Sequence, residues 1–232
     1  MKRLVWLVAA VALAVVVAIK LGTADEPAAV ADGISVPTVA PGTDVLSDVA
    51  VIPHRVRDYN YRRAAFGEAW TDDTSAPGGH NGCDSRNDIL NRDLTDKTYV
   101  SIKRCTEAVK TGVLRDPYTS DTIAFSRGNQ VGAAVQIDHI VPLALAWDLG
   151  AKDWPQDQRV RFANDPANLL AVSGKANQDK SDKQPADWMP PNHGFWCQYA
   201  MQYIAVLRGY ALPVDEPSVP VLREAAGTCP TG

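Results

Sequence analysis

The sequence lacks three features, and each absence argues against a class of protein. It contains no internal repeat, which argues against solenoid architectures. Its 4 cysteines include no C-x-x-C pair, which argues against a structural zinc site. Basic residues are not in excess, since the chain has 23 Lys and Arg and 27 Asp and Glu. Residues 1–24 contain three of the basic residues and no acidic one. The rest of the chain therefore has 20 basic and 27 acidic residues, a net charge of −7. Such a protein does not coat nucleic acid nonspecifically, so it would bind a polyanion through a local patch, a bound cation, or both.

The four cysteines indicate an exported, disulfide-bonded protein. They allow three connectivities. We favour the nearest-neighbour pairing, Cys83–Cys105 with Cys197–Cys229. Each bond would close a loop of a few tens of residues and contribute about 3 kcal/mol in the chain-entropy model.

The first 24 residues have the pattern of a secretory signal peptide. Lys2 and Arg3 precede an apolar run over residues 4–19, which falls short of the roughly 20 residues that span a bilayer, and small residues at 22–24 offer a cleavage site. The alternative is an uncleaved membrane anchor with Lys2 and Arg3 in the cytoplasm. In both cases the segment contacts the membrane or the secretion machinery. The remaining chain is then secreted, or anchored to the cytoplasmic membrane with its domain outside.

Residues 25–53 are rich in Ala and Pro and show no helical or strand periodicity, so we expect a flexible linker. Residues 54–232 are expected to form one monomeric domain. Within it, patterning predicts an α+β fold. Helices are expected over 85–94, 143–149, 156–162, 174–183 and 195–207, and strands over 112–114, 122–125, 135–140 and 169–172.

Asp138 and His139 come at the end of the strand expected over 135–140, and they begin a series with the chemistry of a metal-dependent phosphodiesterase. Asp138 is a hard anionic ligand, and Asn177 can add its amide oxygen, which suits a divalent cation such as Mg²⁺. His139 has an ordinary pKa near 6.5 and can act as a general base. Because adjacent strand residues point to opposite sides, the strand must end or twist there for both to serve one site.

Asn168 and Lys180 complete the series. The Asn168 amide is expected to bond backbone near His139 and so orient the ring. Lys180 lies three residues after Asn177, on the same helix face, and is expected to pair with the phosphate. Taken singly, these residues could be a turn acceptor, a buried histidine, an Asx turn and exposed helix residues. Their joint occurrence favours the site.

In this series the chain resembles the His-Asn-Asn version of the HNH (ββα-metal, or His-Me finger) endonucleases. The resemblance rests on three segments: Asp138-His139-Ile140-Val141-Pro142, Asn168-Leu169 and Asn177-x-x-Lys180-Ser181-Asp182. The later offsets are similar to those in the HNH domain of RNA-guided CRISPR nucleases. A wider resemblance, over roughly residues 60–205, is to secreted bacterial HNH proteins related to the C-terminal region of GmrSD restriction enzymes. It rests on Phe66-Gly67-x-x-Trp70, Asn81-Gly82-Cys83, Arg86, Ile89-Leu90, Arg92-Asp93-Leu94, Asp116-Pro117-Tyr118 and Trp188-x-Pro190.

The resemblance implies a ββα-metal core embedded in a small, mostly helical domain with a β-hairpin. It makes Asp138 and Asn177 the metal ligands and His139 the general base, oriented by Asn168. Asn177 stands where many HNH enzymes have a histidine, which favours Mg²⁺ or Mn²⁺ over Zn²⁺.

We therefore expect a secreted or membrane-tethered endonuclease that cleaves DNA, in preference to RNA, through one divalent cation. Arg86 is expected to reach the phosphate or to pair with Asp88, and Lys175 is a second candidate for substrate binding. No helix suited to reading the major groove is evident, so little sequence specificity is expected. The alternatives are an enzyme acting on RNA or a small phosphodiester with the same site, and a noncatalytic exported module that is stabilised by a metal.

Overall fold

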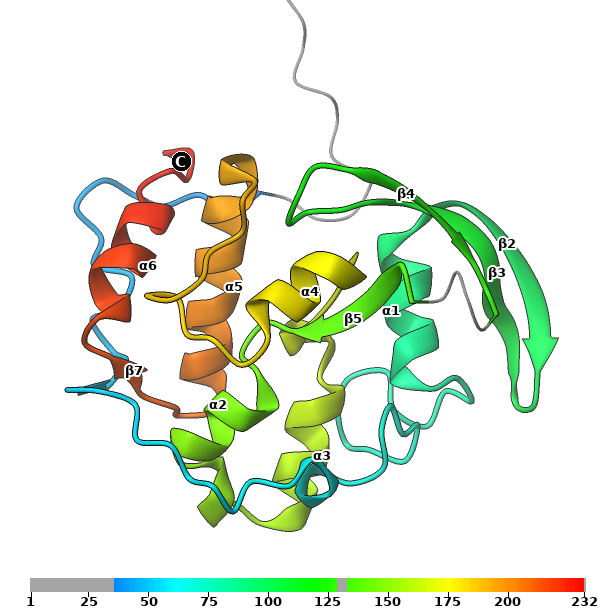
Figure 1. Ribbon diagram of the computed structural model, residues 1–232, viewed down its shortest axis with the longest axis horizontal. Coiled ribbons are helices and arrows are strands. Elements are labelled where there is room, and N and C mark those ends of the chain that lie inside the picture. The colour runs from blue at the N-terminus through cyan, green and yellow to red at the C-terminus, as the bar shows by residue number, and fades with distance from the viewer. Residues whose placement is uncertain (1–35, 129–132, 232) are drawn as a thin grey trace, which may run out of the picture. The chain divides into compact units, whose positions relative to one another are not determined.

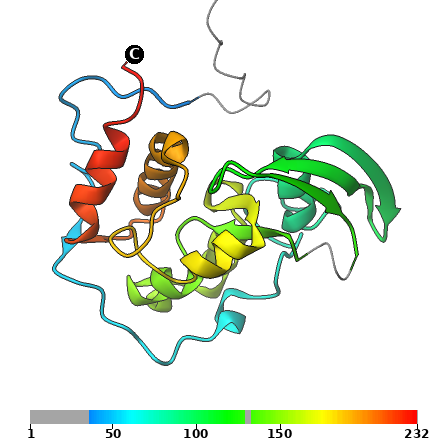
Figure 2. The same ribbon diagram turned by 45° about the horizontal axis from the view of Figure 1, so that its top comes forward.

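The computed structural model describes residues 36–128 and 133–231 (Figure 1). Over these residues the chain has a mixed α+β fold with six α-helices and three small sheets. Figures 1 and 2 both show the β2–β3–β4 sheet on one side of strand β5 and the helices α5 and α6 on the other. The α+β class predicted from the sequence is therefore confirmed.

The centre of the domain is a two-stranded sheet followed by a short helix. Strand β5 (Val135–His139) pairs antiparallel with β6 (Leu169–Ser173), and His139 lies opposite Leu169. All five residues of β6 are buried, as expected for an apolar strand covered on both faces. Helix α4 (Gly174–Lys180) follows at once, and the Ser173 side chain caps it by accepting from the Ala176 N–H. This strand–strand–helix unit is the ββα arrangement that the motif series predicted.

A three-stranded antiparallel sheet packs with helix α1 (Ser85–Asp93) beside this unit. Its strands are β2 (Thr95–Ile102), β3 (Cys105–Arg115) and β4 (Thr122–Ser126). The β3–β4 hairpin was predicted, whereas β2 and the first half of β3 were not. A second hydrophobic cluster joins this sheet and α1 to β5 and β6; it includes Leu90, Val109, Phe125, Ile137 and Leu169.

The other side of the molecule is helical and holds the larger core. It comprises α2 (Leu143–Asp148), α3 (Gln156–Asn164), α5 (Trp196–Gly209) and α6 (Ser218–Ala226). Helix α5 buries Tyr199 and Tyr203, which are four residues apart and so lie on one face. Helix α6 was not predicted.

Residues 36–53 differ from the predicted flexible linker. Val45, Leu46 and Val49 are buried in the main core, and strand β1 (Val51–Ile52) pairs in parallel with β7 (Val214–Asp215). The folded unit accordingly begins at Val36, and the boundary at residue 54 was placed too late. Aliphatic residues without regular spacing can still anchor a segment when its partner strand comes from the far end of the chain. The leader at 1–24 and the linker up to residue 35 lie outside the described residues.

Two disulfides close the fold, in the pairing predicted from the sequence. Cys83–Cys105 links the residue before the cap of α1 to the start of β3, and Cys197–Cys229 links the first turn of α5 to the segment after α6. Along the described ranges, no helix has the length and apolar character needed to cross a bilayer.

Candidate active site

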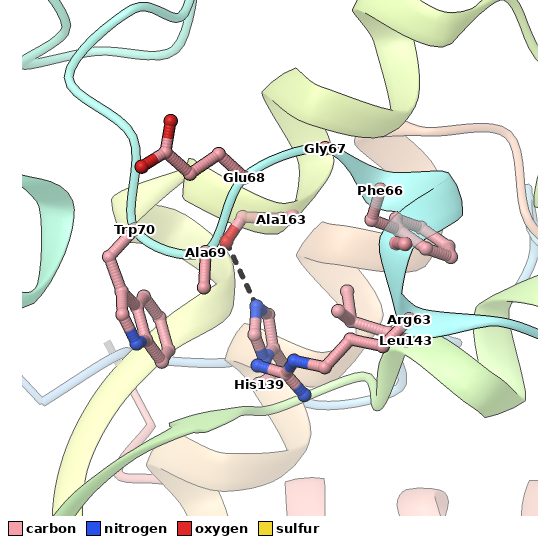
Figure 3. Close-up of a pocket in the computed structure, with 10 residues that line it drawn as sticks. Arg63, Phe66, Gly67, Glu68, Ala69, Trp70, His139, Leu143 and Ala163 are labelled. Atoms are coloured by element: carbon pink, nitrogen blue, oxygen red, sulfur yellow. Dashed lines mark hydrogen bonds between the residues drawn. The ribbon is translucent and has the colours of Figure 1, made fainter.

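His139 borders two hollows on the surface of the domain. The larger, of about 560 Å³, is bordered by β5, by α4 and by residues of the segment before α1. The smaller, of about 220 Å³, is also lined by His139, together with Ala163 and residues of the segment 63–70 (Figure 3). Four residues line both hollows: Arg63, Trp70, His139 and Leu143.

The His139 ring is fixed by two contacts. Its Nε2 lies 2.9 Å from the Ala163 carbonyl oxygen (Figure 3). A carbonyl can only accept, so Nε2 carries the proton and Nδ1 keeps a free lone pair. Trp70 stacks on the ring, with the planes 12° apart and the ring centroids separated by 5.4 Å. Trp70 itself has φ +61°, a left-handed conformation that costs a tryptophan energy and is held here by the surrounding structure.

His139 is neutral at neutral pH. Its side chain is buried, and burial lowers the pKa to about 3, with smaller contributions in the same direction from the charges of Arg63 and Lys180. A neutral imidazole with one free nitrogen beside a cleft is suited to accept a proton.

Asp138 is buried and held by two side chains. Its Oδ2 accepts a hydrogen bond from the Tyr118 hydroxyl at 2.6 Å and lies 2.9 Å from Lys180 Nζ, which also donates to Oδ1 at 3.1 Å. Burial raises the pKa of Asp138 and lowers that of Lys180, while their attraction opposes both shifts. Oδ1 accepts only one of these bonds and has a lone pair to spare.

The structure contradicts the predicted contact of Lys180 with a substrate phosphate. The Lys180 side chain has no exposed surface, and its Nζ also donates to the His139 carbonyl oxygen at 2.8 Å. The sequence spacing placed Asn177 and Lys180 on one face of α4. In the folded protein the Lys180 side chain is buried against the end of β5, whereas Asn177 borders the cleft.

Asn168 makes the contacts that were expected of it. Its Oδ1 accepts from the Val141 N–H at 2.8 Å, its Nδ2 donates to the Val141 carbonyl at 3.2 Å, and its backbone oxygen accepts from the Ile140 N–H at 2.8 Å. These bonds fix the two residues that follow His139. The orienting role of Asn168 toward His139 stays a prediction.

Asn177 presents an oxygen to the cleft. Its Nδ2 donates to Gln136 Oε1 at 2.9 Å, so its amide oxygen is left to accept or to bind a cation. Gln136 and Asp138 lie two apart on β5, on the same face of the strand. Among the described residues, no three His, Cys, Asp or Glu side chains gather as a metal site. An ion here would rest on one carboxylate, amide oxygens, water and phosphate, which are the ligands of Mg²⁺.

The two candidates for substrate binding have different positions. Arg86 lines the cleft, is half-buried and donates to the Val135 carbonyl at 3.3 Å. Asp88 accepts from Asn81 instead of pairing with Arg86, and burial followed by the charge of Arg127 lowers the Arg86 pKa. Lys175 is exposed, pairs with Asp179 at 2.6 Å and does not line the cleft, so its role in substrate binding stays a prediction.

Two residues of the site were not predicted as such: Tyr118 and Trp70. Tyr118 and Trp70 occur in the segments of the wider resemblance, but nothing in their spacing connects them with residues 138 and 139. Arg63 was one of several arginines close together in the sequence, and only the fold separates it from its neighbours.

The family model for the C-terminal domain of GmrSD restriction endonucleases matches residues 84–216, more than half of the chain. The chain belongs to this family. The matched part contains the ββα unit and Tyr118, whereas Arg63 and Trp70 precede it. Membership of this family means that residues 84–216 form a nuclease-family domain with an HNH-like fold.

A relative from the fungus Arthroderma benhamiae, described as an uncharacterized secreted protein, is 32% identical over 205 residues. The alignment covers 88% of this chain and 92% of the relative, so it includes the segment that precedes the family domain. With its two disulfides, this chain is likewise an exported protein.

Proposed function

We propose that the protein is a metal-dependent endonuclease that hydrolyses DNA phosphodiester bonds outside the cytoplasm, with little sequence specificity. The observation that carries the proposal is the position of His139. A neutral imidazole, with its orientation fixed and one nitrogen free, borders the same cleft as the Asp138 carboxylate and the Asn177 amide. Membership of a nuclease family supports the reaction class.

In this proposal His139 Nδ1 takes the proton of the attacking water. Ala163 and Trp70 hold the ring in one tautomer and one orientation, and Asn168 holds the turn that follows it. A general base held in this way contributes about 10²- to 10⁴-fold in rate.

Asp138 and Asn177 would hold the cation, Mg²⁺ or Mn²⁺. When bound, the ion supplies positive charge to the phosphate and to the departing oxygen. Tyr118 and Lys180 orient the Asp138 carboxylate and leave part of it open to the cleft.

The deciding experiment uses the full-length protein with plasmid, single-stranded DNA and RNA, each with Mg²⁺, Mn²⁺, Zn²⁺ or chelator. Cleavage of DNA that requires Mg²⁺ or Mn²⁺ is expected. His139→Ala should lower plasmid nicking by at least about 10²-fold, the lower range for a general base. Unchanged nicking by a folded His139→Ala protein would remove the assignment.

The same assay separates the alternatives when a small phosphodiester is added as a fourth substrate and the melting temperature is measured with and without chelator. Preference for RNA, or turnover of a small phosphodiester alone, would keep the site and change the substrate. A noncatalytic module would show no cleavage of any substrate, while chelator would still lower its melting temperature.

A further inference from the structure

Because Lys180 is buried, the positively charged side chain that contacts the substrate phosphate must be another residue. We propose that Arg63 is the phosphate-binding residue of this site. It stands on a second wall of the cleft, formed by residues 61–70, which precede the family domain. The inference rests on the proposed function, since it assumes that a phosphodiester occupies the cleft.

Arg63 has the position that this role requires. It lines both hollows that His139 borders, and its side chain reaches toward the imidazole in Figure 3. The Glu68 carboxylate points away from His139 in the same view. Because Arg63 stands beside the general base, a phosphate bound to it would lie within reach of the water that His139 activates.

The charge of Arg63 is also available. Arg63 is exposed, and within the described part of the chain no carboxylate lies in ion-pair contact with it. The two arginines earlier in the same segment differ in this respect. Arg55 pairs with Asp148 at 2.6 Å and with Asp182 at 2.8 Å, and Arg57 pairs with the same Asp182 oxygen at 2.8 Å.

The backbone that carries Arg63 is firmly anchored. Arg63 is the first residue of the 3₁₀ helix η1 (Arg63–Phe66), whose Phe66 is 2% exposed. Phe66 packs against the aromatic rings of Tyr61, Trp147 and Phe162. The helix therefore holds the Cα of Arg63 at the cleft, so that little backbone freedom would be lost when a ligand binds.

Contacts with α3 hold the end of η1. Arg159 Nε donates to the Ala65 carbonyl at 2.9 Å. Gly67 follows with φ +85°, and a Cβ there would lie 2.7 Å from a methyl carbon of Val160, so only glycine fits the turn.

Guanidinium chemistry suits the proposed ligand. The planar fork of Arg binds two phosphate oxygens at once, and it keeps its charge at any working pH. Arg86 lines the same cleft, so two guanidiniums border it, and Asp138 and Asn177 remain for the cation.

Arg62 provides a matched control. It is the preceding residue and is also exposed, but its guanidinium donates to the Tyr59 and Tyr61 carbonyls and does not line either hollow. Arg62→Gln and Arg63→Gln remove the same charge from adjacent positions and differ in access to the cleft.

The experiment measures binding apart from turnover. Both substitutions are made in the His139→Ala protein, and the affinity for a fluorescent DNA oligonucleotide is followed by anisotropy from 50 to 300 mM salt. Arg63→Gln should reduce the slope of log K against log salt by about one, because one phosphate contact is lost. Arg62→Gln should leave the slope unchanged. Arg63→Lys should restore the slope but not the full affinity, since the charge returns without the fork.

The outcomes separate this inference from the proposed function. Equal slopes for Arg62→Gln and Arg63→Gln, in a protein whose wild type cleaves DNA, would overturn the role of Arg63 and leave the nuclease standing. A wild type that neither binds nor cleaves nucleic acid would overturn both.

Discussion

The ammonium of Lys180 lies 2.9 Å from one carboxylate oxygen of Asp138 and 3.1 Å from the other, and both side chains are buried. The same ammonium donates to the His139 carbonyl at 2.8 Å. Lys180 thus joins the end of α4 to the tip of β5. It therefore stabilises the position of Asp138, the candidate metal ligand, and of His139, the candidate base.

Removal of Lys180 is expected to destabilise the protein strongly. Lys180→Met leaves Asp138 buried without its counter-charge, and loss of one partner of a buried pair costs about 3–5 kcal/mol. Urea denaturation measures the change. Addition of Asp138→Asn to Lys180→Met should recover part of the loss, because the unpaired charge is then gone. A Lys180→Met protein within 1 kcal/mol of wild type would contradict the role assigned to the pair.

Tyr118→Phe tests the other contact of Asp138. The substitution removes the hydroxyl that donates to Oδ2 at 2.6 Å and leaves a buried acceptor with one partner fewer. We expect a loss of about 1–3 kcal/mol in the free energy of unfolding. Tyr203→Phe is the control, since Tyr203 is also buried and it is Tyr118, not Tyr203, that donates to Asp138. Equal effects of the two substitutions would argue against a specific hold on Asp138.

Trp70 is expected to act on turnover more than on binding. Its indole stacks on His139, and loss of the stack in Trp70→Leu frees the ring to tilt. Misplacement of a catalytic group by about 1 Å lowers rates by up to roughly 10²-fold. Steady-state cleavage should show a lower kcat with KM little changed, and Trp70→Phe should retain more activity. A loss that falls on KM alone would instead place Trp70 in substrate binding.

Stability should depend on pH through His139. Burial lowers its pKa to about 3 in the folded state, whereas histidine in an unfolded chain titrates near pH 6.5. Between these values the unfolded chain binds a proton that the folded chain does not, so the free energy of unfolding falls as the pH drops below about 6.5.

Urea denaturation of wild type and His139→Asn at pH 7 and pH 5 measures this effect. From pH 7 to pH 5 the wild type should lose about 2 kcal/mol more than the variant. The comparison cancels the titration of Asp138 and other carboxylates, which both proteins share. Parallel losses in the two proteins would mean that folding does not lower the pKa of His139.

The centre of the fold was accessible from the sequence because its signals are local. The apolar run 169–172, the cap at Ser173 and the residues at the end of β5 lie within short stretches, and the structure places them as expected. The disulfides followed from proximity in the sequence.

The remaining features depend on contacts between distant segments. Spacing put Lys180 on the face of Asn177, but burial is decided by where α4 packs, which no local pattern records. Residues 36–53 looked like a linker because β7, the strand that pairs with β1, lies more than 150 residues further along the chain. Trp70 and Tyr118 reach residues 139 and 138 only through tertiary packing.

The disulfides straddle the limits of the matched domain. Cys83 lies one residue before its start and Cys229 lies beyond its end, whereas Cys105 and Cys197 fall inside. A recombinant fragment trimmed to residues 84–216 would therefore carry two orphan thiols, and each would be open to oxidative crosslinking between chains. Inactivity or aggregation of such a fragment would then result from its trimming and would say nothing about the activity of the whole chain.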